Sequence, residues 1–126
     1  MPSCPFCTLD LRVRIETDDA IAFRDGYPIS PGHTLVIPRL HSASLFDLPQ
    51  RSQVAVWEMV AQVRTALSQE FHPDGFNIGL NDGVAAGQTV MHAHIHVIPR
   101  YSGDVPDPRG GVRWVIPGKA NYWSKP

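Results

Sequence analysis

Short stretches of alternating apolar and polar residues recur along the chain, and this period-two pattern is typical of β-strands with one buried face. Residues 11–15 alternate aliphatic with charged side chains, and residues 20–24 are mostly apolar. The acidic stretch 16–19 between them predicts a turn, so the first two strands are expected to form a hairpin. A loop punctuated by proline and glycine follows at 25–32, and residues 33–38 predict a third strand.

The middle of the chain changes from a period of two to a period between three and four. Over residues 50–71, apolar side chains recur three and four positions apart, which predicts an amphipathic helix with one face against a sheet. Trp57 and Met59 lie within this segment, and both are expected to pack in the core. Segments 76–80 and 92–98 return to alternation, which predicts two more strands.

Together these patterns predict an α+β fold with an antiparallel sheet of about five strands and one long helix. The length of 126 residues suits one domain across 1–126, and a hydrophobic content of 43% is ordinary for a globular protein. A net charge of −1 argues against a nucleic-acid partner or an anionic membrane. No apolar run approaches about 18 residues, and no export signal begins the sequence. We therefore expect a cytoplasmic protein that does not insert into membranes.

Candidate chemistry concentrates in 92–98, where three of the six histidines alternate with alanine, isoleucine and valine. On a strand, this alternation places the rings of His92, His94 and His96 on one face. His92 and His96 would stand about 13 Å apart along the strand, whereas zinc lies only about 2 Å from each nitrogen ligand. Two of the rings can therefore share a metal, but three cannot.

Phosphate chemistry is the other use for such a row of imidazoles. A neutral imidazole can attack phosphorus while neighbouring rings and backbone amides hold the oxygens. His94, flanked by a histidine on each side, is the natural nucleophile, and the small-residue loop 81–87 before the strand allows amides to approach an anion. A sheet face that is merely rich in histidine is the alternative.

The sequence around these histidines resembles a known family. Segment 92–98 is similar to the alternating histidine and hydrophobic motif of the histidine triad family of nucleotide hydrolases and transferases. The longer string 87–100 looks most like the fragile-histidine-triad and bacterial diadenosine polyphosphate hydrolase side of that family. A second phrase, Pro-Gly-His-x-Leu-Val-Ile-Pro at 31–38, resembles the family's other signature. The resemblance therefore covers the chain from Phe6 to about Tyr101.

The resemblance implies a two-step displacement at the α-phosphorus of a nucleotide, with dinucleoside polyphosphates as the substrate class. His94 would attack and form a nucleotidyl-histidine, which water would then hydrolyse. His96 would donate a hydrogen bond to a non-bridging oxygen while charge accumulates there. Further phosphate contacts are expected from Asn81, Gly87, Gln88 and Thr89.

The same resemblance implies a pocket for the nucleoside. Asp25 matches an acidic or amide residue that binds the ribose hydroxyls, and a loop aspartate that caps a turn is the alternative. His33 matches a buried histidine that orients a partner ring rather than reacting. The base pocket is expected to be apolar, although its residues are equally compatible with plain core; they are Phe6, Leu9, Phe23 and Leu35.

Cys4 and Cys7 are the only cysteines, and their spacing allows a redox pair, a disulfide, half of a metal site, or two free thiols. A redox motif would follow a strand, yet only three residues precede it. Structural zinc commonly takes two cysteines and two histidines, and His41 and His92 are the candidates. A subset of histidine triad proteins and the related galactose-1-phosphate uridylyltransferases carry such a site, so 1–10 is the expected zinc-binding segment.

Further expectations accompany the resemblance. Histidine triad proteins are generally homodimers, and magnesium can accompany the substrate. Rival activities are nucleoside phosphoramidate hydrolysis and nucleotidyl transfer to phosphate, while a non-catalytic nucleotide-binding module and a metalloenzyme with the triad as ligands are more distant alternatives. The tail 102–126 is expected to form a loop and one short strand. Arg113 and Trp114 in this tail are candidates to approach the site and shape the choice of leaving group, and a lid or a dimer contact is the alternative.

Overall fold

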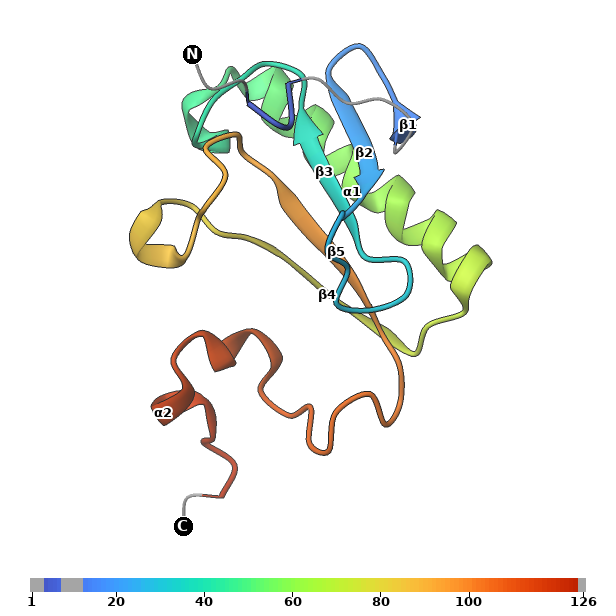
Figure 1. Ribbon diagram of the computed structural model, residues 1–126, viewed down its shortest axis with the longest axis vertical. Helices are drawn as coiled ribbons and strands as arrows, with labels where there is room; N and C mark the ends of the chain where they lie inside the picture. The colour runs from blue at the N-terminus through green and yellow to red at the C-terminus, as the bar shows by residue number, and fades with distance from the viewer. Residues whose placement is uncertain (1–3, 8–12, 125–126) are drawn as a thin grey trace.

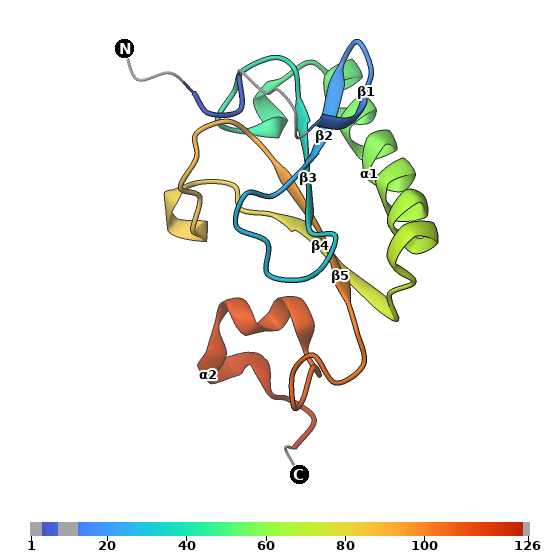
Figure 2. The ribbon, with the colours of Figure 1, turned by 45° about the vertical axis from the view of Figure 1, so that its right-hand side comes forward.

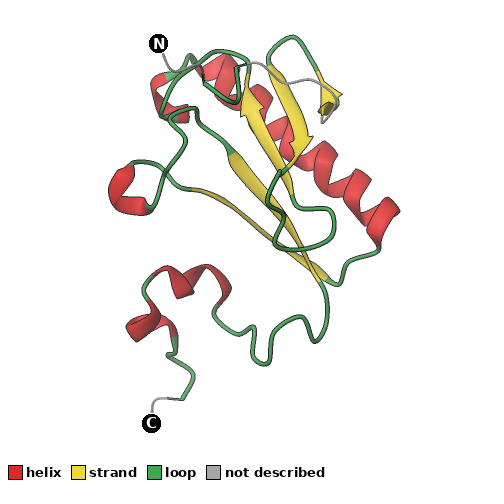
Figure 3. Cartoon of the chain, viewed as in Figure 1, coloured by secondary structure: helices red, strands yellow, loops and turns green. Residues whose placement is uncertain are grey.

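The structure, a computed structural model, describes residues 4–7 and 13–124. Figure 1 shows the strands gathered in one sheet with the long helix running along it, and Figure 3 separates the strands, helices and loops by colour. In chain order the elements are β1 (Val13–Glu16), β2 (Ala20–Arg24), β3 (Thr34–Pro38), η1 (Leu45–Asp47), α1 (Gln50–Phe71), β4 (Gly75–Leu80), η2 (Val84–Ala86), β5 (Ile95–Arg100), η3 (Gly111–Val115) and α2 (Pro117–Ala120).

The sheet of the described residues has five strands in the order β1-β2-β3-β5-β4, and every neighbouring pair is antiparallel. β5, the last strand in the sequence, lies between β3 and β4, where Leu35 and Gly79 flank His96 on its two sides. In chain order, helix α1 lies between β3 and β4. The predicted α+β fold is therefore confirmed.

Helix α1 covers one face of the sheet (Figure 2). Val56, Val60 and Val63 recur at helical spacing and are buried against the aliphatic side chains of β2, β3 and β5. Met59 is buried as predicted, but Trp57 is 42% exposed, so its predicted core position is wrong. The helix turns about 100° per residue, which rotates Trp57 away from the stripe begun by its neighbour Val56. None of the helices in the described residues has the length and apolar character that a bilayer crossing requires.

The opposite face of the sheet carries a smaller apolar cluster. Phe23, Leu35 and Ile37 are buried there, and Phe6 and Ile21 pack against them. Since strand side chains alternate between faces, β5 directs Ile95 and Val97 toward the helix and His96 toward this second face. The face of the sheet that α1 covers thus supplies most of the core, and the opposite face is available to line a site.

Two predicted elements differ from the structure, and part of a third lies outside the described residues. β5 begins at Ile95 rather than at 92, because the preceding backbone bonds elsewhere: the Ala93 N–H donates to the Ser42 carbonyl at 2.7 Å. In the described part of the tail, the structure has the short helices η3 and α2, so the predicted strand there is wrong. The first strand is observed from Val13, and the earlier residues predicted for it lie outside the described residues, as does Leu9.

Candidate functional site

A cavity of about 770 Å³ lies over the second face of the sheet, a size typical of small-molecule sites. Strands β4 and β5 form its floor, the loop after β2 forms one side, and the loop around η2 forms another. The turn at 4–7 and helix η3 of the tail supply the remaining walls, so segments far apart in the sequence line the same cavity. His94 and His96 both line this cavity.

His94 has one nitrogen fixed by the backbone and is only 9% exposed. Its Nδ1 lies 2.8 Å from the carbonyl oxygen of His92. A carbonyl can only accept, so Nδ1 carries the proton and the lone pair of the neutral ring is on Nε2. The rings of His96 and Phe6 lie 5.2 and 5.1 Å from the His94 ring at steep angles. The arrangement leaves one defined nucleophilic nitrogen on a ring that cannot turn freely.

A chain of hydrogen bonds also fixes the tautomer of His96. The Ile29 N–H donates to His33 Nδ1 at 3.2 Å, so His33 Nε2 carries a proton. That nitrogen lies 3.0 Å from His96 Nδ1 and donates to it, which leaves the Nε2–H of His96 as a donor for the cavity. Burial, together with the neighbouring rings of His94 and His33, lowers the pKa of His96 to about 4. The ring is therefore neutral at pH 7.

Asp25 stands beside this chain at the end of β2. Its Oδ1 accepts the Tyr27 N–H at 2.9 Å and caps the loop, while Oδ2 lies 3.4 Å from His33 Nε2. Burial lowers the pKa of His33, and the Asp25 carboxylate opposes that effect. Asp25, His33 and His96 place one ligand atom each within 4.8 Å of one another, and we name them the Asp/His cluster. The carboxylate caps its turn and still lines the cavity.

Gln88 braces the loop that precedes the histidines. Its Oε1 accepts the Gly83 N–H at 2.9 Å, and its Nε2 donates to the carbonyls of Ala43 and Val90 at 2.8 and 3.0 Å. The side chain is 5% exposed and lies outside the cavity lining. The structure thus directs this amide into the loop, where it shapes the backbone, instead of toward the position expected for a phosphate.

The other residues expected to contact phosphate face the cavity. Asn81, Gly87 and Thr89 all line it. Gly87 ends η2 with a φ of 97°, a left-handed conformation that favours glycine, and its backbone closes the turn through an N–H bond to Val84. The loop therefore presents its backbone and one hydroxyl to the same space as His94 and His96.

The apolar part of the cavity combines expected and unexpected residues. Phe6, Phe23 and Leu35 line it as the resemblance implied. Sequence reasoning missed the contributions of Tyr27, Ile29, Asn77 and Ile98. Ile98 had a readable signal, because it shares the period-two face of His94 and His96.

The tail contributes to the cavity through residues other than the two expected. Val112 and Val115 of η3 line the cavity. Arg113 instead donates to two carbonyls of α2, and the Trp114 Nε1–H donates to the Arg109 carbonyl at 2.8 Å. The signal for the valines was their spacing of three, since a 3₁₀-helix has three residues per turn and stacks such positions.

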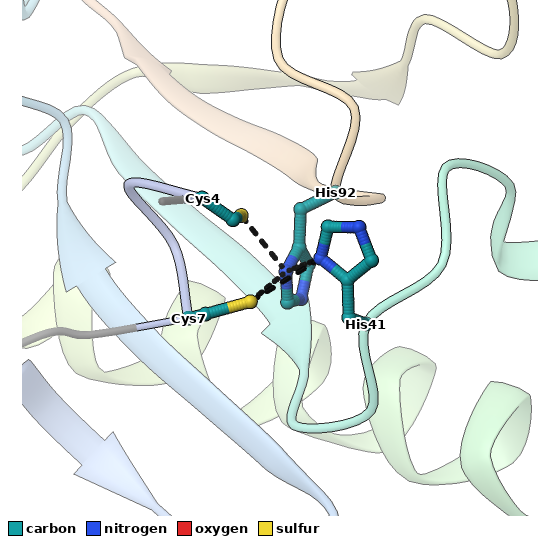
Figure 4. Close-up of side chains that lie close together, drawn as sticks. All are labelled: Cys4, Cys7, His41 and His92. Carbon is teal, nitrogen blue, oxygen red and sulfur yellow. Dashed lines mark hydrogen bonds between the residues drawn. The ribbon is translucent and has the colours of Figure 1, made fainter. Parts of the chain in front are cut away.

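A second cluster lies where the N-terminal turn meets the start of the histidine segment (Figure 4). Cys4, Cys7, His41 and His92, here named the Cys/His cluster, place one ligand atom each within 4.8 Å of one another. Each sulfur lies 3.5 Å from His92 Nδ1, and the Nδ1 atoms of the two histidines are 3.2 Å apart. A tetrahedral zinc would separate sulfur from nitrogen by about 3.6 Å and nitrogen from nitrogen by about 3.3 Å. The four side chains could therefore hold one metal ion.

The orientation of His92 also suits a metal ligand. The ring is fully buried, and its Nε2 lies 2.8 Å from the Pro38 carbonyl, so Nε2 carries the proton and the Nδ1 lone pair faces the thiols. Burial lowers the pKa of His92, which keeps that lone pair available. Cys4 and Cys7 are both free thiols, without a disulfide between them.

Comparison with known proteins places this geometry in context. A family model described as HIT domain matches residues 9–103. The chain is 40% identical over 93 residues to the asymmetrical bis(5'-nucleosyl)-tetraphosphatase of Schizosaccharomyces pombe, covering 74% of this chain and 51% of that protein. It is 38% identical over 89 residues to an adenylylsulfatase of Arabidopsis thaliana, covering 71% of this chain and 45% of that protein.

Solved structures are similar as well. A zinc-bound histidine triad family protein from Mycobacterium smegmatis superposes with a TM-score of 0.74 at 36% identity, covering 83% of this chain and 84% of that one. The chain spans 45% to 63% of the length of the first curated relatives that it matches.

Proposed function

Since this chain belongs to the HIT domain family, we propose that it is a nucleotide hydrolase that cleaves dinucleoside polyphosphates at the α-phosphate. The observation that carries the proposal is the hydrogen bond from His94 Nδ1 to the His92 carbonyl, which leaves Nε2 of a cavity-lining ring as the nucleophile. His96, with its donor nitrogen directed by His33, stands beside it.

The first step forms a covalent intermediate. The Nε2 lone pair of His94 bonds to the α-phosphorus, the bond from phosphorus to the bridging oxygen breaks, and the departing polyphosphate keeps the electron pair. The His96 Nε2–H and the Thr89 hydroxyl donate to the phosphoryl oxygens, where negative charge accumulates. Gly87 and Asn81 complete this side of the site, while the Gln88 amide acts indirectly by holding the loop.

The second step releases the product. Water bonds to phosphorus, the bond from phosphorus to His94 breaks, and the nucleoside monophosphate leaves while the water's proton passes to solvent. His33 takes no part in bond changes and acts as a positioning residue for His96. The base would pack among Phe6, Leu9, Phe23 and Leu35, and Asp25 would accept from the ribose hydroxyls.

Two observations support a substrate with a large leaving group. One relative is named a bis(5'-nucleosyl)-tetraphosphatase. The cavity also continues past His96 to Ile98, Asn77 and the valines of η3, which leaves room for a second nucleoside. A second candidate is a nucleotide with a small leaving group, favoured by the relative named an adenylylsulfatase.

The Cys/His cluster is proposed to bind structural zinc. Its donor set and spacing match tetrahedral zinc, and a solved relative is described as zinc-bound. Zinc there would cross-link the N-terminal turn, the loop after β3 and the segment before β5, and it is given no role in bond making. Magnesium would arrive with the phosphates of the substrate.

A homodimer in the cytoplasm completes the proposal. β4 is an edge strand of the sheet, and natural proteins commonly cover such an edge or pair it. Two free thiols that serve as metal ligands suit a reducing compartment. Light scattering on the purified protein would measure twice the 13.9 kDa chain mass for the dimer and a single chain mass if this part of the proposal is wrong.

The test is a substrate panel read by chromatography. Diadenosine tri- and tetraphosphate, adenylyl sulfate and adenosine phosphoramidate are incubated with the protein and with a His94→Ala control. We expect AMP from the diadenosine compounds, no turnover by the control, and a radiolabelled nucleotidyl-protein when the wild-type reaction is quenched early. AMP release only from adenylyl sulfate or the phosphoramidate would select the second candidate. Turnover that persists in the control would overturn the histidine mechanism.

A further inference from the structure

One short turn joins the Cys/His cluster to the nucleoside end of the cavity. The Cys7 N–H donates to the Cys4 carbonyl at 3.1 Å, which closes the turn. Pro5 and Phe6 occupy its tip, and both line the cavity. Figure 4 shows the two thiols that flank this tip directed at His41 and His92. An ion held by the thiols therefore also holds the cavity wall between them.

Phe6 contacts both parts of the proposed nucleotide site. Its ring centroid lies 5.2 Å from that of Phe23, in the apolar cluster of the second sheet face. It lies 5.1 Å from His94, with the two rings at 82°. One side chain thus packs against the base pocket and against the ring proposed to attack phosphorus.

In the described part of the chain, the two thiols supply the polar contacts between the turn and other segments. Among the described residues, its contacts within hydrogen-bonding range of other segments are those from Cys4 and Cys7 to His41 and His92, at 3.2 to 3.5 Å. Thiols are weak hydrogen-bonding groups, whereas thiolates are strong metal ligands. The two histidines stand on segments already tied together by the bond from Ala93 to Ser42. A metal would thus replace weak thiol contacts with strong bonds to two histidines whose segments are already joined.

We propose that the metal at the Cys/His cluster positions Phe6, so that metal binding and nucleotide binding strengthen each other. This inference rests on the nucleotide site proposed above. The metal holds Phe6 where the base packs, and a base packed on Phe6 holds the cysteines for the metal. Coupling between two sites is reciprocal, so each ligand raises the affinity for the other by the same factor, about tenfold for a coupling of ordinary size.

Zinc transfer to a chromogenic chelator tests the coupling without any turnover. Zinc-loaded protein is brought to equilibrium with the chelator in the absence and presence of saturating AMP, and absorbance gives the share of zinc that the chelator holds. AMP is expected to raise the zinc affinity of the wild type about tenfold. In Phe6→Ala this increase in affinity is expected to disappear, and in the milder Phe6→Leu it is expected to shrink.

Tyr27→Ala is the matched control, because Tyr27 lines the same cavity from a different loop. This variant is expected to keep the full increase in zinc affinity once AMP is raised to saturation. Calorimetry supplies the reciprocal measurement: AMP should bind the zinc-loaded wild type about tenfold more tightly than the zinc-free protein.

Two results would overturn the inference: bound AMP that leaves the zinc affinity of the wild type unchanged, or AMP that raises the zinc affinity of Phe6→Ala as much as that of the wild type. A zinc-loaded wild type that binds no AMP at all would overturn the proposed nucleotide site as well. The failure of the coupling and the failure of the proposed function therefore give different results.

Discussion

The Cys/His cluster and the Asp/His cluster lie on either side of His94, yet they prepare their histidines for different work. In the first, the Pro38 carbonyl takes the Nε2 proton of His92 and turns a lone pair toward two thiols. In the second, the Ile29 N–H donates to Nδ1 of His33, so the proton of His33 is on Nε2, which donates to His96. The backbone partner of one nitrogen thus decides what the other nitrogen can do.

The two clusters are expected to serve different properties of the protein, one its stability and the other its catalysis. The Cys/His cluster joins distant parts of the chain and would act on folding, whereas the Asp/His cluster lines the cavity and would act on the reaction. His94 lies between the two clusters. On the side of the Cys/His cluster it contacts Phe6 and the His92 carbonyl. A change in one cluster should therefore leave the other cluster's own property, metal binding or catalysis, largely unaltered.

Metal removal should have the largest effect. If zinc is present at about a thousand times its dissociation constant, its removal costs about 4 kcal/mol of unfolding free energy, which corresponds to roughly 15 °C in Tm. Scanning calorimetry with and without a chelator measures the shift. His33→Ala protein, with its Cys/His cluster intact, should show the same shift, while a double Cys4→Ser, Cys7→Ser variant should show none. Chelation that leaves the wild-type Tm unchanged would contradict a structural metal.

His33→Ala should come next, and it should act on catalysis alone. His96 loses the donor that fixes its tautomer, so kcat for the diadenosine substrate should fall about 100-fold. His33→Gln offers an amide that can accept from Ile29 and donate to His96, so it should recover part of the loss. Zinc content measured by mass spectrometry should equal that of the wild type in both variants. Equal loss in both variants would count against the hydrogen-bond chain.

The pH dependence of stability should show a smaller effect from His96. Its pKa is lowered to about 4 in the folded protein, against about 6.5 when unfolded. Between these values the unfolded chain binds more protons, so this stability is fully present above pH 6.5 and is lost as pH falls toward 4. The loss at pH 4.5 should be about 2 kcal/mol after allowance for partial exposure.

Urea denaturation of the wild type and of His96→Asn at pH 7 and pH 4.5 isolates this contribution. The groups that face His96 are His94, His33 and Asp25, and these remain in the variant along with the whole Cys/His cluster. Subtracting the two proteins therefore cancels the pH dependence of the metal and leaves that of His96 together with its coupling to those three groups. A difference between the proteins that stays constant with pH would show that His96 does not carry the effect.

Asp25→Asn should have the smallest effect and should sharpen the split between ribose binding and loop capping. The asparagine carbonyl can still accept the Tyr27 N–H, so the loop keeps its cap. Loss of the charged acceptor should weaken AMP binding about tenfold. Calorimetry measures the affinity of the wild type and of Asp25→Asn for AMP and for a 2',3'-dideoxy analogue. The analogue, which lacks the ribose hydroxyls, should bind the two proteins equally. Zinc affinity in the absence of nucleotide should be unchanged.

Local patterns were enough to predict most of the fold. The buried face of a strand or helix carries apolar residues that recur with the period of that element. The alternation of the strands and the helical repeat over 50–71 are therefore visible in the sequence. Trp57 was misplaced because an aromatic residue at the border of the helical stripe fits either environment. The start of β5 was misplaced because the partner that interrupts it, Ser42, lies far away in the sequence.

Site residues that form a regular sequence pattern could be predicted, whereas residues whose role depends on how distant segments pack could not. His94 and His96 stand out by alternation, and the cysteines stand out by spacing. The amide of Gln88 bonds to backbone atoms on two separate segments, a choice that depends on how the loop packs. Val112 lines the cavity only because the tail folds back toward β4, and no local pattern records that path.

The separation along the chain between the Cys/His ligands has a consequence for biosynthesis. Cys4 and His92 are 88 residues apart, and synthesis delivers them in that order. While the ribosome is still making α1, the two thiols have no complete set of partners and stand available to cellular metal carriers and oxidants. The set is complete only once His92, just ahead of His94 and of β5, has emerged. Metal binding by all four residues therefore requires that translation has passed His92 and that the segment before β5 lies against the N-terminal turn.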